Sequence, residues 1–180
     1  KLIETLEILP SHWLIVPTQG KKPLGYQWQQ YPFTPQSLRE QLVRIGKVKV
    51  RDGACSLYEA HPTGIGLLCG QNSQEFLVSI DCDGLSAYER IKTVAPKPLP
   101  PTVAFTSGRK GRAQYLFKIQ KSPTQHLQSR KIATAKGEAL ELRGSNLQSV
   151  LPPSIHPITG HYHWLPGCRP DEIQVAAAPN

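Results

Sequence analysis

Short apolar segments separated by turn-forming residues recur along this 180-residue chain, and they restrict it to a fold rich in β-strands. Strands are predicted over residues 13–17, 64–70, 76–81, 102–107, 114–119, 139–143, 148–152 and 161–164. Residues 34–46 and 85–94 have helical spacing instead, and Thr34 followed by proline is typical of a helix start. Because predicted strands outnumber helices, we expect one domain of the α+β (mixed α/β) class.

The predicted connections between these segments are mostly short. We expect a hairpin between residues 64–70 and 76–81, a second around the loop 108–112, and a pair formed by 139–143 and 148–152. A short helix is predicted from Asp171. We assign residues 1–170 to the domain and residues 171–180 to a tail or the start of a linker.

Positive charge is concentrated in one part of the chain. The formal net charge is +8 with a pI near 9.5. Residues 97–143 hold ten Lys or Arg and only two acids, so this segment carries the whole surplus. Such a field attracts the phosphates of nucleic acids or nucleoside triphosphates. The alternative is a solvated basic face without a partner.

The remaining composition bears on the setting of the protein. No apolar run approaches the roughly 20 residues that cross a bilayer, and no leader-like segment opens the chain, so we expect neither a membrane protein nor a secreted one. The four cysteines form no CxxC pair, which favours reduced thiols and a cytoplasmic (intracellular) protein. The chain contains no Met, so we expect it to be part of a longer protein.

Two aspartates end the most apolar predicted strand, as Asp81-Cys82-Asp83-Gly84. Alternate residues of a strand share a face, so the two carboxylates lie about 7 Å apart on one side. Like charges in this arrangement favour a hard divalent cation between them, with Mg²⁺ a typical choice. The alternative is that Asp83-Gly84 forms a turn and helix cap, with Asp81 exposed.

A third carboxylate, Glu141, lies between two leucines in ALELRG, so it faces away from its apolar neighbours. Two aspartates on one strand and an acid on another could together hold two metal ions. Such a pair can activate a 3′ hydroxyl, neutralise a triphosphate and stabilise the leaving pyrophosphate. The alternative for Glu141 is an ordinary solvent-facing strand residue.

The loop Ser107-Gly108-Arg109-Lys110-Gly111-Arg112 connects two predicted strands. Its glycines allow backbone amides to approach an anion, and its arginines can bind phosphate in bidentate fashion. The loop is not a Walker A motif, because GxxxxGK[ST] is absent. The alternative is a basic hairpin tip in water.

Prolines restrict the segment Leu151-Pro152-Pro153-Ser154-Ile155-His156-Pro157, so Ser154 and His156 are held with little freedom. His156 could bind phosphate or transfer a proton, although a lone histidine is more often structural. A zinc site at His161, His163 and Cys168 lacks a clear ligand spacing.

In its order of motifs, the chain resembles the primase-polymerase domain of the archaeo-eukaryotic primase superfamily. The resemblance covers residues 13–164, through WLIVPTQGKKPLGYQW, GIGLLCGQNS, LVSIDCDG, TVAFTSGRKGRAQYLF, and LELRG followed by LPPSIHPITGHYHW. It implies a primase-type catalytic core, with an RRM-like sheet joined to a second small α/β unit. It also implies template-directed nucleotidyl transfer with Mg²⁺ or Mn²⁺, in replication of a plasmid, phage or similar element.

The resemblance also implies roles for particular residues. The catalytic metal ligands would be Asp81, Asp83 and Glu141. The nucleotide-binding set would be Ser107, Gly108, Arg109, Arg112, Gln114, Arg143, Ser154 and His156. Expected partners are nucleoside triphosphates, a single-stranded or primed DNA template, and a fused or separate helicase domain, with no membrane partner.

One position departs from the family pattern. The second motif usually ends in a histidine that contacts the nucleotide phosphates, and Gln114 occupies the matching place. Glutamine can donate a hydrogen bond but carries no charge. This departure keeps open the hypothesis of a catalytically weakened, nucleic-acid-binding replication initiator. A metal-dependent nuclease is a third hypothesis, against which the basic loop argues mildly.

Overall fold

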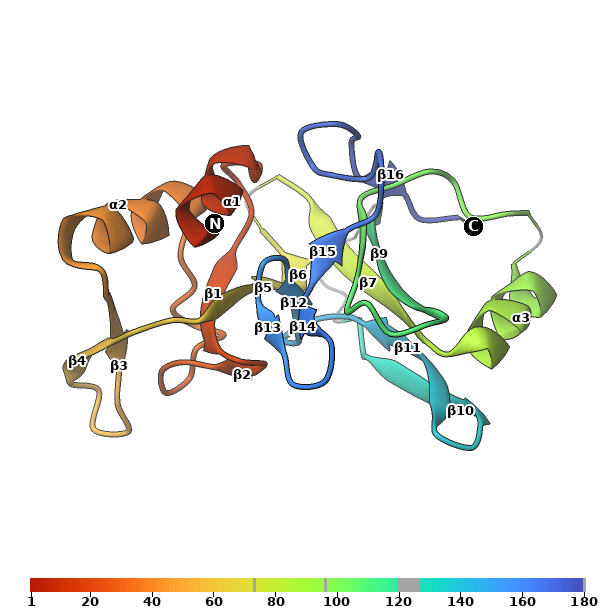
Figure 1. Ribbon diagram of the computed structural model, residues 1–180, viewed down its shortest axis with the longest axis horizontal. Helices are drawn as coiled ribbons and strands as arrows, with labels where there is room; N and C mark the ends of the chain where they lie inside the picture. Colours follow the sequence, from red (N-terminus) through yellow and green to blue (C-terminus); the bar gives the residue numbers. More distant parts are fainter. Residues whose placement is uncertain (73, 96, 120–126, 180) are drawn as a thin grey trace.

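The computed structural model describes residues 1–179 apart from 73, 96 and 120–126, and it has a mixed α+β fold (Figure 1). Its described helices are α1 (Leu2–Ile8), α2 (Pro35–Ile45) and α3 (Leu85–Val94). Two of the three predicted helices, over residues 34–46 and 85–94, are confirmed, and α1 was not predicted. None of the described helices is long and apolar enough to cross a membrane.

The ends of α2 follow from its sequence. Thr34 Oγ1 accepts a hydrogen bond from the Ser37 N–H at 3.1 Å, and Ser37 Oγ accepts one from the Thr34 N–H at 3.1 Å. This reciprocal pair satisfies two amides that lack helical partners. Gly46 ends the helix with φ +67°, a conformation that glycine adopts without strain. Leu38 and Leu42 then lie buried on one face of α2.

Most strands belong to two sheets. The four-stranded sheet has the order β12 (Gln148–Leu151), β5 (Gly64–Leu68), β1 (Ile15–Gln19), β2 (Lys22–Pro23). The larger sheet has the order β10 (Arg130–Ala135), β11 (Glu138–Arg143), β7 (Phe76–Asp83), β9 (Arg112–Ile119), β8 (Ala104–Thr106), β15 (His163–Trp164), with β6 (Gly70–Gln71) beside β7 and β16 (Ala176–Ala177) beside β9. Two small hairpins are β3 (Val48–Arg51) with β4 (Leu57–Ala60), and β13 (Ile155–His156) with β14 (Gly160–His161). All pairings in these sheets are antiparallel except that of β16 with β9.

Two predicted strand pairings are wrong. β5 does not pair with β7, because β5 lies between β1 and β12 in the smaller sheet, and only β6 forms a short hairpin with β7. β11 does not pair with β12 either, since the chain leaves the larger sheet after β11 and enters the smaller one. In both cases the strands are neighbours in sequence but find partners far along the chain. The hairpin of β8 and β9 around the basic loop is confirmed.

The predicted helix from Asp171 is also wrong. Residues 171–173 form a turn, and the following alanines form β16. The Ala176 N–H donates to Thr102 Oγ1 at 3.0 Å, and the Val175 side chain is buried in the core. Pairing with β9 satisfies the backbone that a helix would otherwise satisfy internally.

The main core joins the two sheets and sets the position of the acids. It contains Ile15 and Leu67 from the smaller sheet together with Leu77 and Leu116 from the larger one. Because side chains alternate along β7, Leu77 shares its face with the aspartates farther along the strand. The other face of β7 packs Cys82 against α3. The acids therefore face the smaller sheet, and α3 covers the opposite side.

Candidate active site

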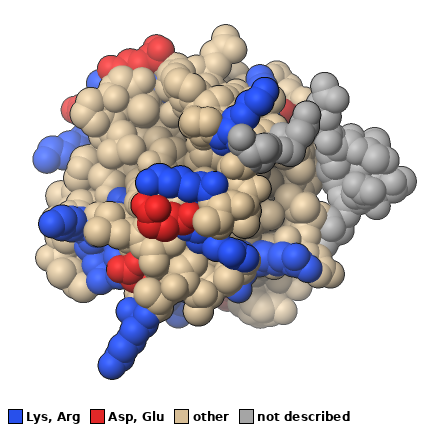
Figure 2. All heavy atoms as spheres, turned by 90° about the vertical axis from the view of Figure 1, so that its right-hand side faces the viewer, with Lys and Arg blue, Asp and Glu red and all other residues tan. Residues whose placement is uncertain are grey.

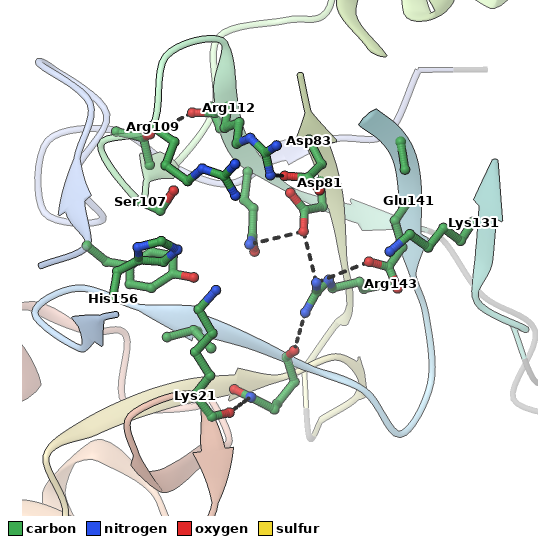
Figure 3. Close-up of a pocket in the computed structure, with 17 residues that line it drawn as sticks. Lys21, Asp81, Asp83, Ser107, Arg109, Arg112, Lys131, Glu141, Arg143 and His156 are labelled. Atoms are coloured by element: carbon green, nitrogen blue, oxygen red, sulfur yellow. Dashed lines mark hydrogen bonds and ion pairs between the residues drawn. The ribbon is translucent and has the colours of Figure 1, made fainter. Parts of the chain in front are cut away.

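A cavity of about 320 Å³ opens between the two sheets, at the end of the core where β7 and β11 carry their acids (Figure 3). Polar and charged side chains dominate its wall. The lining residues are Lys21, Asp81, Asp83, Thr106, Ser107, Arg109, Arg112, Ala113, Gln114, Lys131, Ala139, Glu141, Arg143, Gln148, Val150, His156 and Tyr162.

Strand register brings the three acids together. Asp81 on β7 lies directly opposite Glu141 on β11 and opposite Gln114 on β9. Asp83 follows two residues later on the same face and lies opposite Arg112. The alternative that Asp83-Gly84 forms a turn and helix cap, with Asp81 exposed, is confirmed only in part. Gly84 is the N-cap of α3, but Asp83 is the last residue of β7 and the Asp81 side chain is only 16% exposed. The structure thus gathers the three carboxylates on one wall of the cavity.

Two arginines neutralise these acids. The Arg143 Nη2 donates to Asp81 Oδ2 at 2.9 Å and to Glu141 Oε2 at 3.1 Å, while its Nη1 donates to the Gln148 carbonyl at 2.9 Å. Arg112 forms an ion pair with Asp83. Each predicted metal ligand therefore already has a cationic partner, and Arg143 also links the larger sheet to β12 of the smaller one.

Burial and crowding change the proton affinities of this cluster. Burial raises the pKa of Asp81; Arg143 opposes this shift, while Asp83 and Glu141 add to it by like-charge repulsion. Burial alone would lower the pKa of Arg143, but the adjacent Asp81 and Glu141 outweigh it, so the Arg143 pKa is raised. Arg143 therefore stays charged wherever the acids are ionised.

The donor atoms suit a hard divalent ion in kind. Besides the three carboxylates, the amide oxygen Oε1 of Gln114 is buried in the cavity wall and has no hydrogen-bond partner among the described residues. Carboxylate and amide oxygens are the ligands that Mg²⁺ and Mn²⁺ prefer. Across the described ranges, however, no group of three His, Cys, Asp or Glu side chains is placed to hold a metal. Arg143 lies between Asp81 and Glu141, so an ion held by both carboxylates would compete with this guanidinium.

The basic loop is fixed at its base by Thr106. The Thr106 hydroxyl donates to the Arg112 carbonyl at 2.6 Å and accepts from the Gly108 N–H at 3.0 Å. Gly111, with φ +69°, completes the turn and packs against Leu85 too closely for a Cβ. The loop is thereby held over one end of the cavity.

Lys21 and Arg109 point into the cavity from opposite sides (Figure 3). Burial lowers the pKa of Lys21, and repulsion from Arg109 lowers it further. Neither side chain forms an ion pair with a carboxylate in the part of the chain that the structure describes. These two cations are consequently available to an anionic ligand.

His156 is oriented by the turn that follows it. Its Nδ1 accepts from the N–H groups of Ile158 and Thr159, each at 3.3 Å, so Nε2 carries the proton. Burial lowers the His156 pKa, and the nearby cations lower it further. The imidazole is therefore neutral near pH 7 and can donate one hydrogen bond from Nε2.

Ser154 and Gly108 do not line the cavity. Ser154 is fully buried, and its hydroxyl accepts from the Ile65 N–H at 2.8 Å and donates to the Ile65 carbonyl at 2.9 Å. A Cβ at Gly64 would overlap the Ser154 side chain, so glycine is required beneath it. Ser154 therefore joins the Pro152-Pro153 segment to β5 through these two hydrogen bonds.

Five polar lining residues were not predicted to belong to the site: Lys21, Thr106, Lys131, Gln148 and Tyr162. Lys21 lies in the Lys-Lys-Pro loop, which carried a signal as part of the family resemblance. Thr106 and Tyr162 likewise lie in motifs of the resemblance, whereas Lys131 and Gln148 have no local signal because they reach the cavity only through sheet packing. Gln148, for example, donates from Nε2 to the Lys21 carbonyl at 2.9 Å across the smaller sheet.

Basic side chains extend beyond the cavity. The face at the α3 and β10 end of the molecule carries more Lys and Arg than Asp and Glu (Figure 2). In the cavity itself five cationic side chains meet three carboxylates. Both observations favour a polyanionic ligand.

Comparison with known proteins gives a family for this architecture. The family model described as "Bifunctional DNA primase/polymerase, N-terminal" matches residues 5–180, nearly the whole chain. No curated protein matches the chain. The resemblance inferred from the motifs is thus confirmed: the chain belongs to the bifunctional DNA primase/polymerase N-terminal family and is a nucleotidyltransferase.

Proposed function

We propose that the cavity between the two sheets catalyses template-directed nucleotidyl transfer to DNA, by starting a strand or extending one. The observation that carries this proposal is the convergence of Asp81, Asp83 and Glu141 opposite two cations without carboxylate partners, Lys21 and Arg109. The cavity volume of about 320 Å³ lies within the range of small-molecule sites, roughly 300–1,000 Å³. The wall with the three carboxylates suits the metal ions that accompany a triphosphate, and the wall with Lys21 and Arg109 suits its phosphate oxygens.

In this proposal the fold is a primase-type core. The larger sheet with α3 corresponds to the RRM-like part, and the smaller sheet with α1 and α2 corresponds to the second α/β unit. The active site then lies where the two parts meet, and both contribute side chains to it.

Asp81, Asp83 and Glu141 would hold Mg²⁺ or Mn²⁺, which would neutralise the triphosphate and activate the attacking hydroxyl. Arg109 and Lys21 bind the phosphate oxygens from opposite sides. His156 donates from Nε2 as a neutral group, and Ser107 adds a hydroxyl at the base of the loop. Gln114 stands beside Asp81 and supplies a hydrogen bond where the family has histidine.

The wider setting is also a proposal. The substrates would be nucleoside triphosphates and a single-stranded or primed DNA template, in replication of a plasmid, phage or similar element. A helicase domain, fused or separate, would supply the template strand. The described cysteines are all free thiols, which agrees with an activity inside the cell.

The direct test combines primer extension and de novo synthesis on a single-stranded template, with Mg²⁺ or Mn²⁺ and with both deoxynucleotides and ribonucleotides. We expect incorporation with pyrophosphate release by the unmodified protein, and its loss in Asp81→Asn and Glu141→Gln. The matched control is Asp171→Asn, which removes one acid from an exposed ion pair with Arg169. Normal incorporation by Asp81→Asn would refute the assignment of the acids. Degradation of DNA without pyrophosphate release would point to the nuclease hypothesis.

Two observations favour a second candidate, a weakened enzyme that serves mainly as a nucleic-acid-binding initiator module. All three acids are ion-paired to arginine, and Gln114 replaces the usual histidine. This candidate predicts DNA binding with very slow incorporation under either metal. Gln114→His distinguishes the two, because a large gain in incorporation would show that glutamine limits the reaction.

A further inference from the structure

A second pocket lies apart from the active site, between the loop after β2 and the hairpin of β3 and β4. Its volume is about 340 Å³, and the residues that line it include Tyr26, Trp28 and Tyr31 together with Lys49 and Arg51. The hairpin stands at the end of the molecule opposite α3 (Figure 1). We refer to Tyr26, Trp28 and Tyr31 as the aromatic platform.

The platform presents large rings to solvent. Tyr26 is 48% exposed and Tyr31 is 43% exposed. The guanidinium carbon of Arg51 lies 4.5 Å from the centre of the Tyr31 ring, which is a cation–π contact. Among the described residues, no ion pair with a carboxylate involves Arg51 or Lys49. Exposed rings beside unpaired cations form a surface that is apolar and positively charged together.

The backbone holds this surface in place. The Tyr26 N–H donates to the Arg51 carbonyl at 2.7 Å, so the loop is bonded to β3. Gly25 has φ +92°, and a Cβ there would lie 3.1 Å from Val50 Cβ. Glycine thus allows the loop to pack closely on the hairpin. The rings need little ordering before a ligand binds, which lowers the entropic cost of binding.

The loop connects the platform to the active site. Lys21 lines the catalytic cavity, and the same segment reaches the platform at Tyr26. Five residues span at most about 18 Å. The platform therefore lies within reach of a strand that also enters the catalytic cavity.

We propose that the aromatic platform, with Lys49 and Arg51, is a stacking site for single-stranded DNA. Unpaired bases stack on exposed rings, and the adjacent cations meet the phosphates, a combination typical of sites that bind single strands without sequence preference. A duplex offers no free base faces, so it is excluded as the preferred ligand. Identifying this strand as the template rests on the proposed function, whereas the binding itself does not.

The test measures fluorescence anisotropy of a labelled 15-nucleotide oligodeoxythymidylate with EDTA present and no nucleotide. Tyr31→Ala should weaken binding roughly 5- to 160-fold, the range expected for loss of one stacked base. Tyr31→Phe keeps the ring and should bind as the unmodified chain does. The matched control is Tyr58→Ala, because Tyr58 is 42% exposed on the same hairpin but does not line the pocket. Equal affinities for Tyr31→Ala and Tyr58→Ala would overturn the proposal.

A second measurement does not depend on the Tyr31 variants. Single-stranded DNA should quench tryptophan fluorescence in the unmodified chain, and Trp28→Phe should remove most of that quenching; unchanged quenching would overturn the proposal. Tighter binding of a matched RNA or duplex would overturn the assignment to single-stranded DNA. If the chain binds DNA through the platform but incorporates no nucleotide, only the proposed function is refuted. If it incorporates nucleotide but Tyr31→Ala leaves DNA binding unchanged, only this inference is refuted.

Discussion

Replacing Arg143 by glutamine tests whether a metal ion and this arginine compete for the same acids. In the structure Arg143 joins Asp81, Glu141 and the Gln148 carbonyl, and the side chains of these ion pairs are only 16–22% exposed. Arg143→Gln removes the cation and leaves Asp81 and Glu141 side by side on one wall of the cavity without their arginine partner. We expect a less stable protein whose stability depends strongly on divalent ions.

The size of the effect follows from burial. Removing one partner of a fully buried ion pair costs about 3–5 kcal/mol, and the partial exposure here lowers that to about 2–3 kcal/mol. For a chain of this length each kcal/mol shifts Tm by about 2–4 °C, so Tm in EDTA should fall by about 4–12 °C. A bound metal at a free concentration of 100 times its Kd raises the free energy of unfolding by about 2.7 kcal/mol. In Arg143→Gln, Mn²⁺ should therefore restore most of the loss.

The assay is thermal unfolding followed by circular dichroism, in EDTA and in increasing Mn²⁺. The unmodified chain should show a smaller Mn²⁺ shift than Arg143→Gln, because the ion must first displace the guanidinium. Arg169→Gln is the control, since its ion pair with Asp171 is exposed and should alter Tm little. Identical Mn²⁺ shifts in the unmodified chain and Arg143→Gln would show that metal and arginine do not compete. A higher Tm for Arg143→Gln in EDTA would show that the ion pairs do not stabilise the fold.

Three further predictions concern other parts of the molecule. Gln114→Ala should lower kcat/KM for nucleotide incorporation about 10- to 100-fold, as expected for one or two hydrogen bonds to a charged ligand, and steady-state primer extension measures it. Ser154→Ala should lower the free energy of unfolding by about 1–3 kcal/mol in urea titrations, because the backbone of β5 loses its buried partner, while an unchanged midpoint would contradict the structure. At pH 8 a thiol reagent should modify exposed Cys55 first and leave Cys69 and Cys82 unmodified until the protein unfolds. The reason is that burial raises the pKa of Cys69 to about 11 and that of Cys82 to about 12. Rapid reaction of either buried thiol in the native state would contradict this prediction.

Local sequence predicted the longer buried strands and two helices, but it missed α1, β3, β4 and β10, and two of the three predicted strand pairings are wrong. The segment that forms β7 is apolar enough to be recognised as a strand from its own residues. Thr34 and Gly46 likewise indicate where α2 begins and ends. The partners of β5 and β12 were missed because buried strands of two adjoining sheets have similar composition. A buried strand joins one sheet or the other through packing with distant segments, so its own residues do not predict which sheet it joins.

The same division holds for the active site. The acids were predictable because alternation along β7 fixes which side chains share a face, and Glu141 stands out between two leucines. Lys21 and Gln148 were not, since they belong to the smaller sheet and reach the cavity only when the two sheets pack together. The ion pairs of Arg143 were missed for a related reason: its place between Asp81 and Glu141 depends on the register of β11 against β7.

The two sheets and the site chemistry are linked through Arg143. Its Nη2 neutralises acids of the larger sheet, while its Nη1 holds the carbonyl of Gln148 in the smaller one. Gln148 in turn donates to the Lys21 carbonyl, so the lysine on the far wall is tied into the same chain of bonds. A ligand that displaces Arg143 from the acids therefore acts on both walls of the cavity. The guanidinium bonds β12 through Nη1 and the acids through Nη2, so this one planar group holds the acids and the smaller sheet at the same time.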